Sequence, residues 1–567
     1  MTIHTPLRTD LAFVAPLTPM FADLVGRLTA DTMVSQTRRR DMISGLRRVA
    51  KALGLPPEDV PCSGRWLQPR LSKISPASLG LTAKAWQNAV SDARAAMAHF
   101  GIFERRFNRI SDLSPEWRAL WSAVLASNDK TLEPALCRFV YFLSGQGIRP
   151  DQVGEEHALA YREALIRNEI SKSPDVAHRA ALNGWNLAVR RIAEWPRQKL
   201  LVVSRQKIFT MNQEAFPASF RAEVSDILAK FAAPDPLGED GRTKPLRPVT
   251  ISQYRRYFFR FASELVHSGL SADAVTGFSI LLDPKMFERG LRQLLSRTGN
   301  KTTKMIGDIA KLLAGLGKIV GVPADVEQTL RKLAAKVAYD KPRGMTRKNR
   351  DRLRVLQDAK TQQRLLHLPE RLFACPAGKA KAFTMALARE DAVAIAILLI
   401  CPIRVKNLAQ IHVEQNLHRP GDGRTFLVLT QDEVKNERPL EFELPRDLAR
   451  MIDRHLATRS PELCPKGTPW LFPRRDGRVA ISAGALAARV SKRIRKETGL
   501  EMNAHLFRHF AVMNWLDAYP GGYEGARRLL GHSEVSNTIQ MYSGLEVRTA
   551  TKTFADLIEK KKKGPRR

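Results

Sequence analysis

The sequence predicts a mainly α-helical protein of several domains, with one small β-hairpin toward its carboxyl end. Apolar residues recur at spacings of three and four along most of the 567 residues, and glycine or proline separates the segments. Residues 424–430 and 438–445 instead have the pattern of two short strands joined by a polar connection. At about 100–200 residues per domain, this length predicts roughly three to five domains.

Three segments interrupt the helical pattern and divide the chain. Residues 102–115 join two helical blocks, residues 233–248 are rich in proline, glycine and charge, and residues 340–352 form a basic stretch. Each is typical of a solvated connection. We therefore expect helical domains at 1–115, 116–232 and 245–340. A fourth domain at 353–567 would contain the hairpin and end in a basic tail.

A weak repeat precedes the last of these connections. Gly54, Gly147 and Gly269 each follow a predicted helix, with an acidic residue four positions later and a valine six positions later. The second and third copies also share an Arg-Phe pair nine residues before the glycine. Either this part of the chain contains a triplicated unit, or the common use of glycine at helix ends produces the similarity by chance.

The charge of the chain points to a polyanionic partner. Lys and Arg outnumber Asp and Glu by 92 to 57, which gives a net charge of +35. The basic residues are spread along the chain, whereas a membrane-surface protein would concentrate them on one amphipathic helix. The five cysteines form no CxxC pair, which argues against a zinc ribbon or a disulfide framework. The longest apolar run, 392–403, is too short to cross a bilayer, and no secretory signal is visible, so we expect a cytoplasmic protein.

One stretch near the carboxyl end carries the most chemical information. His505 and Arg508 are three residues apart on a predicted helix, which places both on one face. Arginine offers a planar fork of donors that matches phosphate oxygens, and histidine can transfer a proton near neutral pH. His505 and His509 also have the spacing of a zinc pair, but a zincin would have Glu in place of Leu506. No third ligand follows at a suitable spacing, so we expect no metal.

Three further residues have ordinary explanations when they are considered singly. Gly531-His532 could be a helix end with an exposed histidine, and Tyr542 could be a packing residue. Arg404 follows a predicted buried helix and could form a structural ion pair. Because a buried arginine cannot stay unpaired, it must meet a carboxylate, helix-end carbonyls or an anionic ligand.

Taken in order, these residues resemble the catalytic set of the tyrosine recombinase (phage integrase) family. The matching motifs are Arg404-x-x-Asn407-Leu408, His505-Leu-Phe-Arg508-His509, Leu530-Gly531-His532 and Tyr542, with Lys435 on the hairpin connection. The resemblance covers about residues 355–560. It extends less specifically to 240–340, which looks like the family's helical, SAM-like core-binding domain. The first 230 residues match only through the weak repeat and could be further SAM-like units.

The chain departs from the usual family pattern in two places. Many members have a glutamate where this sequence has Asn407, and an asparagine gives that position a different hydrogen-bonding support. The interval from His532 to Tyr542 is one residue longer than is common in the family.

The resemblance implies a complete set of roles without metal, cofactor or ATP. Arg404 and Arg508 would clamp the scissile phosphate, and His532 would donate a further hydrogen bond to it. Tyr542 would attack to form a 3′-phosphotyrosine, with His505 as the base and Lys435 as the acid for the leaving 5′-oxygen.

The resemblance also implies partners. The partner would be double-stranded DNA, bound by a homotetramer on two sites, with or without partner recombinases. Phe554, Leu557 and Ile558 lie on one face of the helix after the nucleophile, which would dock on a neighbouring subunit or pack within its own chain. In the core-binding domain, a single helix carries basic residues that suit phosphate contacts or form a solvated face: Arg255, Arg256 and Arg260.

The predicted function is therefore site-specific DNA recombination by the integrase of a mobile element. Two alternatives share the fold: a type IB topoisomerase-like enzyme that relaxes DNA, and a DNA-binding protein that has lost catalysis. A hydrolytic nuclease would need clustered acidic metal ligands, which the sequence does not offer.

Overall fold

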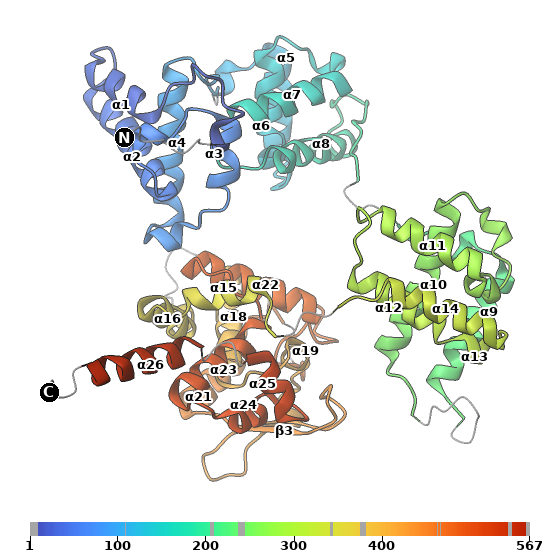
Figure 1. Cartoon of the computed structure of the whole chain (residues 1–567). Helices are drawn as coiled ribbons and strands as arrows, with labels where there is room; N and C mark the ends of the chain where they lie inside the picture. Colours follow the sequence, from blue (N-terminus) through green and yellow to red (C-terminus); the bar gives the residue numbers. More distant parts are fainter. Residues whose placement is uncertain are drawn as a thin grey trace. The chain divides into compact units, whose positions relative to one another are not determined.

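The structure is a computed structural model that describes residues 9–107, 109–204, 209–235, 244–340, 344–374, 382–461, 463–464, 467–542 and 547–562. These residues are mostly helical and contain one small antiparallel sheet, which confirms the predicted fold class (Figure 1). The chain divides into two compact units, one formed by residues 1–202 and 344–567 and the other by residues 203–343. Within the described part of the chain, no helix combines the length and apolar character needed to cross a bilayer.

The first 202 residues contain two hydrophobic clusters, each built on four helices. The two clusters meet where α3 contacts α7. The first cluster is formed by α1 (Phe21–Ala30), α2 (Gln36–Leu53), α3 (Gly64–Leu71) and α4 (Ala83–His99). The second is formed by α5 (Pro115–Ala126), α6 (Leu132–Gly145), α7 (Glu155–Asn168) and α8 (Pro174–Arg191).

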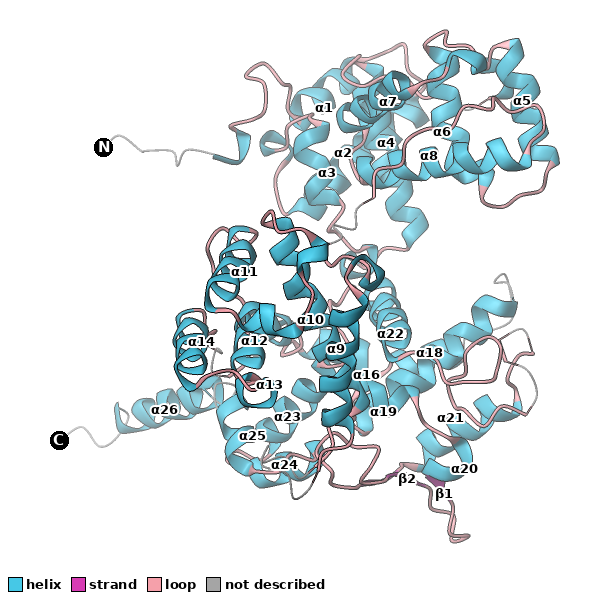
Figure 2. Cartoon of the chain, turned by 90° about the vertical axis from the view of Figure 1, so that its right-hand side faces the viewer, coloured by secondary structure: helices cyan, strands magenta, loops and turns pink. Residues whose placement is uncertain are grey.

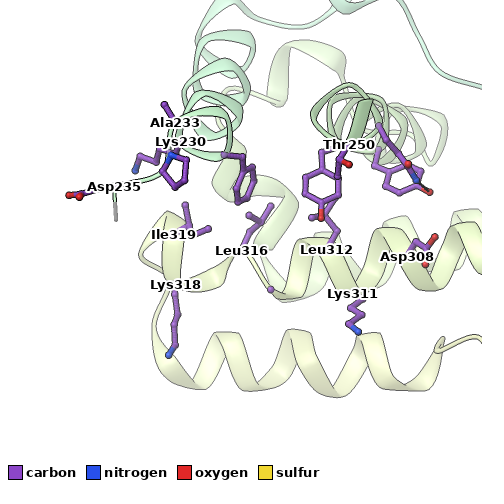
Figure 3. A pocket seen from close by; sticks show the side chains of 16 residues that line it. Lys230, Ala233, Asp235, Thr250, Asp308, Lys311, Leu312, Leu316, Lys318 and Ile319 are labelled. Carbon is purple, nitrogen blue, oxygen red and sulfur yellow. Dashed lines mark hydrogen bonds between the residues drawn. The ribbon is translucent and has the colours of Figure 1, made fainter. Parts of the chain in front are cut away.

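The second unit is a bundle with a phenylalanine-rich core. It consists of α9 (Ala218–Ala232), α10 (Pro248–His267), α11 (Pro284–Ser296), α12 (Lys304–Ala314), α13 (Gly317–Val320) and α14 (Ala324–Lys336). A cavity of about 930 Å³ lies between the end of α9, the first half of α10 and helices α12 and α13, with Leu312, Leu316 and Ile319 among its lining residues (Figure 3).

The packing of α9 differs from the sequence-based division of the chain. The sequence placed residues 218–232 at the end of the second helical domain. In the structure, Phe220 and Phe231 are buried in the same core as Phe258, and α9 packs against α10. The apolar face of α9 is thus covered by the helices that follow it. Part of the expected connection, residues 236–243, lies outside the described residues.

The three glycines of the sequence repeat occupy equivalent local structures. Each follows a long helix and has a positive φ: 70° at Gly54, 70° at Gly147 and 101° at Gly269. A side chain is disfavoured in this left-handed region, which explains the glycine. A short 3₁₀ helix follows each one: Pro57–Asp59, Pro150–Gln152 and Ala272–Ala274. The shared succession of α2, α6 and α10 with these turns supports the proposal of a triplicated unit.

The carboxyl-terminal part contains the sheet and a large hydrophobic core. Its first helices are α15 (Arg347–Val355), α16 (Ala359–Leu366), α17 (Leu368–Phe373), α18 (Ala382–Ile400), α19 (Val405–Ala409) and α20 (Val413–Asn416). Its later helices are α21 (Arg446–Ala457), α22 (Ala483–Thr498), α23 (Leu506–Ala518), α24 (Tyr523–Leu530), α25 (Val535–Tyr542) and α26 (Val547–Lys562). The last five residues of the expected basic tail, 563–567, lie outside the described residues.

The sheet contains the predicted hairpin and one further strand. Strands β2 (Phe426–Leu429) and β3 (Leu440–Glu443) pair antiparallel, with Leu427 opposite Phe442. Strand β1 (Leu417–His418) was not predicted, because two residues are too few to show alternation. Strands β1 and β2 lie beside α20 (Figure 2).

Helix α23 lies at the centre of the carboxyl-terminal part. It contacts α18, α24 and α25, and α15 also packs on it. Helix α15 begins at Arg347, inside the segment that the sequence presented as a basic connection, because Met345 and Leu353 are buried in this core. The residues at the start of α23 therefore lie near segments that are far away in the sequence.

Candidate active site

The buried helix α18 leads directly to Arg404. Its residues from Ala388 to Leu398 are almost entirely buried, and Arg404 then caps the short helix α19. The half-buried guanidinium donates through Nη2 to the side-chain oxygen of Asn436, at 3.2 Å. Burial lowers the pKa of Arg404 below its ordinary value. Among the described residues, Arg404 is thus paired with an amide and with no carboxylate. Its positive charge is therefore not neutralised.

Arg508 is buried in the first turns of α23 and is fixed by two backbone carbonyls. Its Nη1 donates to the carbonyl of Pro402 at 2.5 Å, and its Nη2 donates to the carbonyl of Leu530 at 2.9 Å. These bonds connect the start of α23 to the segment before Arg404 and to the end of α24. Burial and the positive charge of Arg404 lower the pKa of Arg508 to about 10. A guanidinium has five N–H donors, so this geometry leaves donors for an anion.

Three histidines lie near the two arginines: His505, His532 and His509. Desolvation and the charges of Arg508 and Arg404 lower the pKa of His505, although one side of the residue is open to solvent. The same causes, in the same order, lower the pKa of His532 to about 4, and Arg527 adds to them. Both rings are therefore neutral near pH 7.

The third histidine, His509, was considered in the sequence as a zinc ligand and as the end of a family motif, and was assigned no role in the site. Its buried ring lies between two others, 5.0 Å from His505 and 5.3 Å from Tyr542 between ring centroids. Burial and the neighbouring charges, that of His505 first, lower its pKa to about 4. No group of three or more potential metal ligands occurs among the described residues.

The turn that carries His532 requires a glycine. Gly531 ends α24 with φ of 62°, a left-handed conformation. A Cβ atom there would lie 2.7 Å from the Leu440 side chain of β3. The turn directs the ring of His532 so that Nδ1 lies 2.9 Å from the buried hydroxyl of Thr538. If that hydroxyl donates to Nδ1, the proton of the neutral ring resides on Nε2.

Tyr542 is the last residue of α25 and is only 3% exposed. Burial raises the pKa of its phenol to about 12, while the charge of Arg508 lowers it in part. The tyrosine is thus near the arginine, but it is covered by protein in this structure. Residues 543–546, which follow it, lie outside the described residues.

Lys435 lies on the connection between β2 and β3, and its side chain is exposed. Two asparagines hold this connection close to the arginines. Asn407 donates to the carbonyl of Glu433 at 2.9 Å, and Asn436 donates to the carbonyl of Gly531 at 2.8 Å. The unusual Asn407 therefore supports the Lys435 connection through a backbone bond, which a glutamate could not donate.

The structure brings five of the six predicted residues together: Arg404, His505, Arg508, His532 and Tyr542. The sixth, Lys435, is adjacent to the group through its neighbour Asn436. Sequence reasoning missed Asn436 and His509. His509 could have been recognised from its place one helical turn after His505. Asn436 gave no signal, because its partners are Arg404 and Gly531, which are distant in the sequence.

The three arginines of α10 that were predicted to contact DNA lie in different surroundings. Arg256 is exposed and Arg255 is half-buried. Arg260 is different, because its guanidinium pairs with the fully buried carboxylate of Glu264, which also accepts from Arg297 at 2.7 Å. Arg260 therefore forms a structural ion pair, and its charge is already neutralised, so it does not suit a phosphate contact.

Comparison with known proteins identifies the class of this part of the chain. Residues 371–547 match the phage integrase family, and this segment is a domain of that family. The domain contains all six residues of the predicted catalytic set. No curated protein matches the sequence.

Several solved structures of recombinases have likeness to the chain. One is the XerH site-specific recombinase in a post-cleavage complex with palindromic difH substrate, with 13% identity and a TM-score of 0.36 over 54% of this chain and 79% of that chain. A lambda integrase dimer bound to a COC′ core site has 14% identity and a TM-score of 0.32, over 56% and 95%. The Tn1549 transposon integrase in complex with transposon right-end DNA has 14% identity and a TM-score of 0.32, over 56% and 94%.

Proposed function

We propose that the protein is a site-specific DNA recombinase that cleaves and rejoins duplex DNA through a 3′-phosphotyrosine intermediate. The observation that carries the proposal is the group formed by two unneutralised arginines, two neutral histidines and a tyrosine. It lies within a phage integrase domain. The charges that perturb these residues come mainly from one another, so the group is prepared to receive an anion.

In the cleavage step, the phenolic oxygen of Tyr542 attacks the phosphorus, and the bond from phosphorus to the 5′-oxygen breaks. Arg404 and Arg508 stabilise the additional negative charge of the transition state. His505, neutral because its pKa is lowered, accepts the phenolic proton, and Lys435 donates a proton to the leaving 5′-oxygen. The bond energy is kept in the phosphotyrosine, so that a 5′-hydroxyl can reverse the step on another duplex.

The burial of Tyr542 adds a requirement to this mechanism. A phenol that is 3% exposed cannot reach a DNA phosphate, and its pKa of about 12 disfavours the anion. DNA binding must therefore uncover the tyrosine and move it from beside His509 toward the phosphate. A bound phosphate would also neutralise the two arginines, whose charges add to desolvation in keeping the histidines neutral in the free protein.

Exchange between two duplexes requires four such sites, and we propose a homotetramer. Helix α26 supports this assembly, because Phe554 and Leu557 are 62% and 47% exposed. Apolar side chains of this size on one helix face suit a pocket on a neighbouring subunit. Sedimentation of the protein on DNA with two sites tests the assembly: replacement of Phe554 and Leu557 by serine should leave protomers bound to DNA without tetramers.

The chemistry is tested by comparing wild type with Tyr542→Phe on DNA from the flanks of the protein's own gene. We expect a protein–DNA adduct that survives denaturant in the wild type and disappears in the variant. Tyr519→Phe is the matched control, because Tyr519 is 58% exposed and should not affect the adduct. An adduct that persists in Tyr542→Phe would show that another residue is the nucleophile.

Two related functions give different results in the same system. A topoisomerase-like enzyme would relax supercoiled plasmid without joining two sites. A DNA-binding protein without catalysis would form no adduct even on a duplex with a nick near the scissile position, where loss of the leaving strand traps the covalent product.

A further inference from the structure

Helix α2, in the first 202 residues, has a strongly basic outer face. A shallow groove of about 630 Å³ runs along it. Among its nine lining residues are five cations and no carboxylate: Thr29, Gln36, Arg39, Arg40, Ile43, Ser44, Arg47, Arg48 and Lys51. A local surplus of this kind attracts an anion with several charges.

The packing of α2 fixes the direction of this face. On its opposite side, Met42, Leu46 and Val49 are buried, and α4 lies so close that a Cβ on Gly45 would be 2.7 Å from the backbone nitrogen of Ala93. The helix cannot turn without breaking this contact. The cations of the outer face are thus held on a rigid support, away from the core.

The pairing of these cations leaves most of their charge free. Arg39 donates to a backbone carbonyl, that of Asp31, and Arg40 is 3.5 Å from the exposed carboxylate of its neighbour Asp41. The side chains of Arg47, Arg48 and Lys51 are exposed and make no ion pair or hydrogen bond with the described residues. Like charges one helical turn apart repel each other, so this arrangement costs stability unless a ligand neutralises it.

The dimensions of the face suit a nucleic acid backbone. From Arg40 to Lys51 the helix rises about 16 Å, at about 1.5 Å per residue. Each strand of a DNA duplex carries a phosphate about every 3.4 Å along its axis, so three or four side chains on this helix can meet successive or facing phosphates. Flexible cationic side chains of this kind bind phosphates without reading base sequence.

The structurally similar helix α6 provides a contrast within the chain. It has the same ending as α2, a glycine with positive φ followed by a 3₁₀ turn, but its arginine, Arg138, pairs with the buried carboxylate of Glu169. The helix ending therefore does not require a basic outer face. The row of cations on α2 is a separate feature, and the packing with α4 does not explain it.

We propose that the outer face of α2 is a second DNA-binding surface, which holds the phosphate backbone of duplex DNA separately from the candidate active site. The inference deepens the proposed function, and it rests on that function only for the identity of the polyanion as DNA. It assigns a role to the first helical region, which would lengthen the DNA segment that the protein covers.

The test measures binding and keeps cleavage out. In a Tyr542→Phe background, the triple variant Arg47→Gln, Arg48→Gln, Lys51→Gln is compared with the parent on a random-sequence duplex of about 40 base pairs, by fluorescence anisotropy over a series of salt concentrations. The matched control removes the same charge from other exposed residues of the first 202, without ion pairs in the described structure: Arg190→Gln, Arg197→Gln and Lys199→Gln.

We expect the α2 variant to reduce the slope of log Kd against log salt by about 2.7, which is about 0.9 for each of three lost phosphate contacts. Its affinity at low salt should fall at least about tenfold, whereas the control should change little. Equal effects in the two variants would overturn the proposal, because they would reflect only net charge. Unchanged DNA binding with altered self-association would overturn it as well, since the face would then bind protein.

Because these side chains are exposed, the triple variant should fold normally, and an unchanged melting temperature would verify that it does. Failure of this test would leave the phosphotyrosine chemistry intact. Conversely, absence of the Tyr542 adduct would leave the α2 result standing, because binding to random duplex DNA requires no cleavage.

Discussion

Replacing Asn436 by alanine is expected to slow DNA cleavage while the protein remains folded. The side chain of Asn436 accepts from Arg404 and donates to the carbonyl of Gly531, which precedes His532. It therefore connects three parts of the candidate site: the first arginine, the Lys435 connection and the Gly-His turn. Alanine removes both bonds and leaves the Arg404 guanidinium free to rotate toward solvent.

The magnitude follows from the two lost bonds. A hydrogen bond to a charged group contributes about 1.5–3 kcal/mol and a neutral one about 0.5–1.5 kcal/mol. Because Arg404 is half-buried, water replaces part of the first bond. If about 1.4–2.7 kcal/mol of transition-state stabilisation is lost through a misplaced Arg404, cleavage slows by about 10- to 100-fold. DNA affinity should change by less than about threefold, since many other cations contribute to it.

The assay is single-turnover formation of the covalent adduct at saturating DNA, which separates the cleavage rate from binding. Gln431→Ala is the matched control, because this exposed amide lies on the same connection. Asn436→Asp adds a second measurement: a carboxylate keeps a partner for Arg404 but neutralises it and repels the Gly531 carbonyl. We expect the aspartate to slow cleavage at least as much as alanine. An unchanged rate in Asn436→Ala would refute the positioning role.

Two further predictions concern the stability of the site. The pKa of His509 is about 4 in the folded protein and about 6.5 when unfolded, so the unfolded state binds more protons between these values, and folding free energy is lost as pH falls from about 6.5 to 4. His509 accounts for a decrease in the free energy of unfolding of up to about 3 kcal/mol between these pH values. Urea unfolding at about pH 6.5 and about pH 4 should show a smaller decrease in His509→Phe. Gly531→Ala should lower the free energy of unfolding by about 2–3 kcal/mol, because φ at this position is left-handed and the new Cβ would approach Leu440 closely. Gly521→Ala should lower it by only about 1 kcal/mol, because Gly521 has a φ of 78° but open space around it. Equal melting temperatures of the two alanine variants would show that Leu440 moves aside without cost.

Local features of the sequence sufficed for the helical character and for the hairpin of β2 and β3. A helix repeats every 3.6 residues and a strand every two, so a short stretch reveals its own type. The chemical identities of Arg404, Arg508 and Tyr542 are equally local, since the residue type alone supplies the guanidinium or the phenol. Sequence order alone was therefore enough to indicate a phosphate-binding group and its family.

The partners of those groups were decided only by the tertiary structure. Arg508 donates to the carbonyls of residues 106 positions before it and 22 positions after it, and Asn436 donates to one 95 positions away. Arg260, which the sequence predicted to contact DNA, is instead paired with buried Glu264, a carboxylate that also accepts from Arg297. A hydrogen bond depends on distances of about 3 Å between atoms of unrelated segments, and no periodicity along the chain encodes such a distance.

The same reason explains the burial of Tyr542 and the place of α9. Both depend on which apolar surfaces are covered, and coverage is a property of the assembled core. The sequence determined which residues could perform chemistry and which segments are helical. The tertiary structure decided which of them meet, which are shielded from water, and how far burial and neighbouring charge move their pKa values.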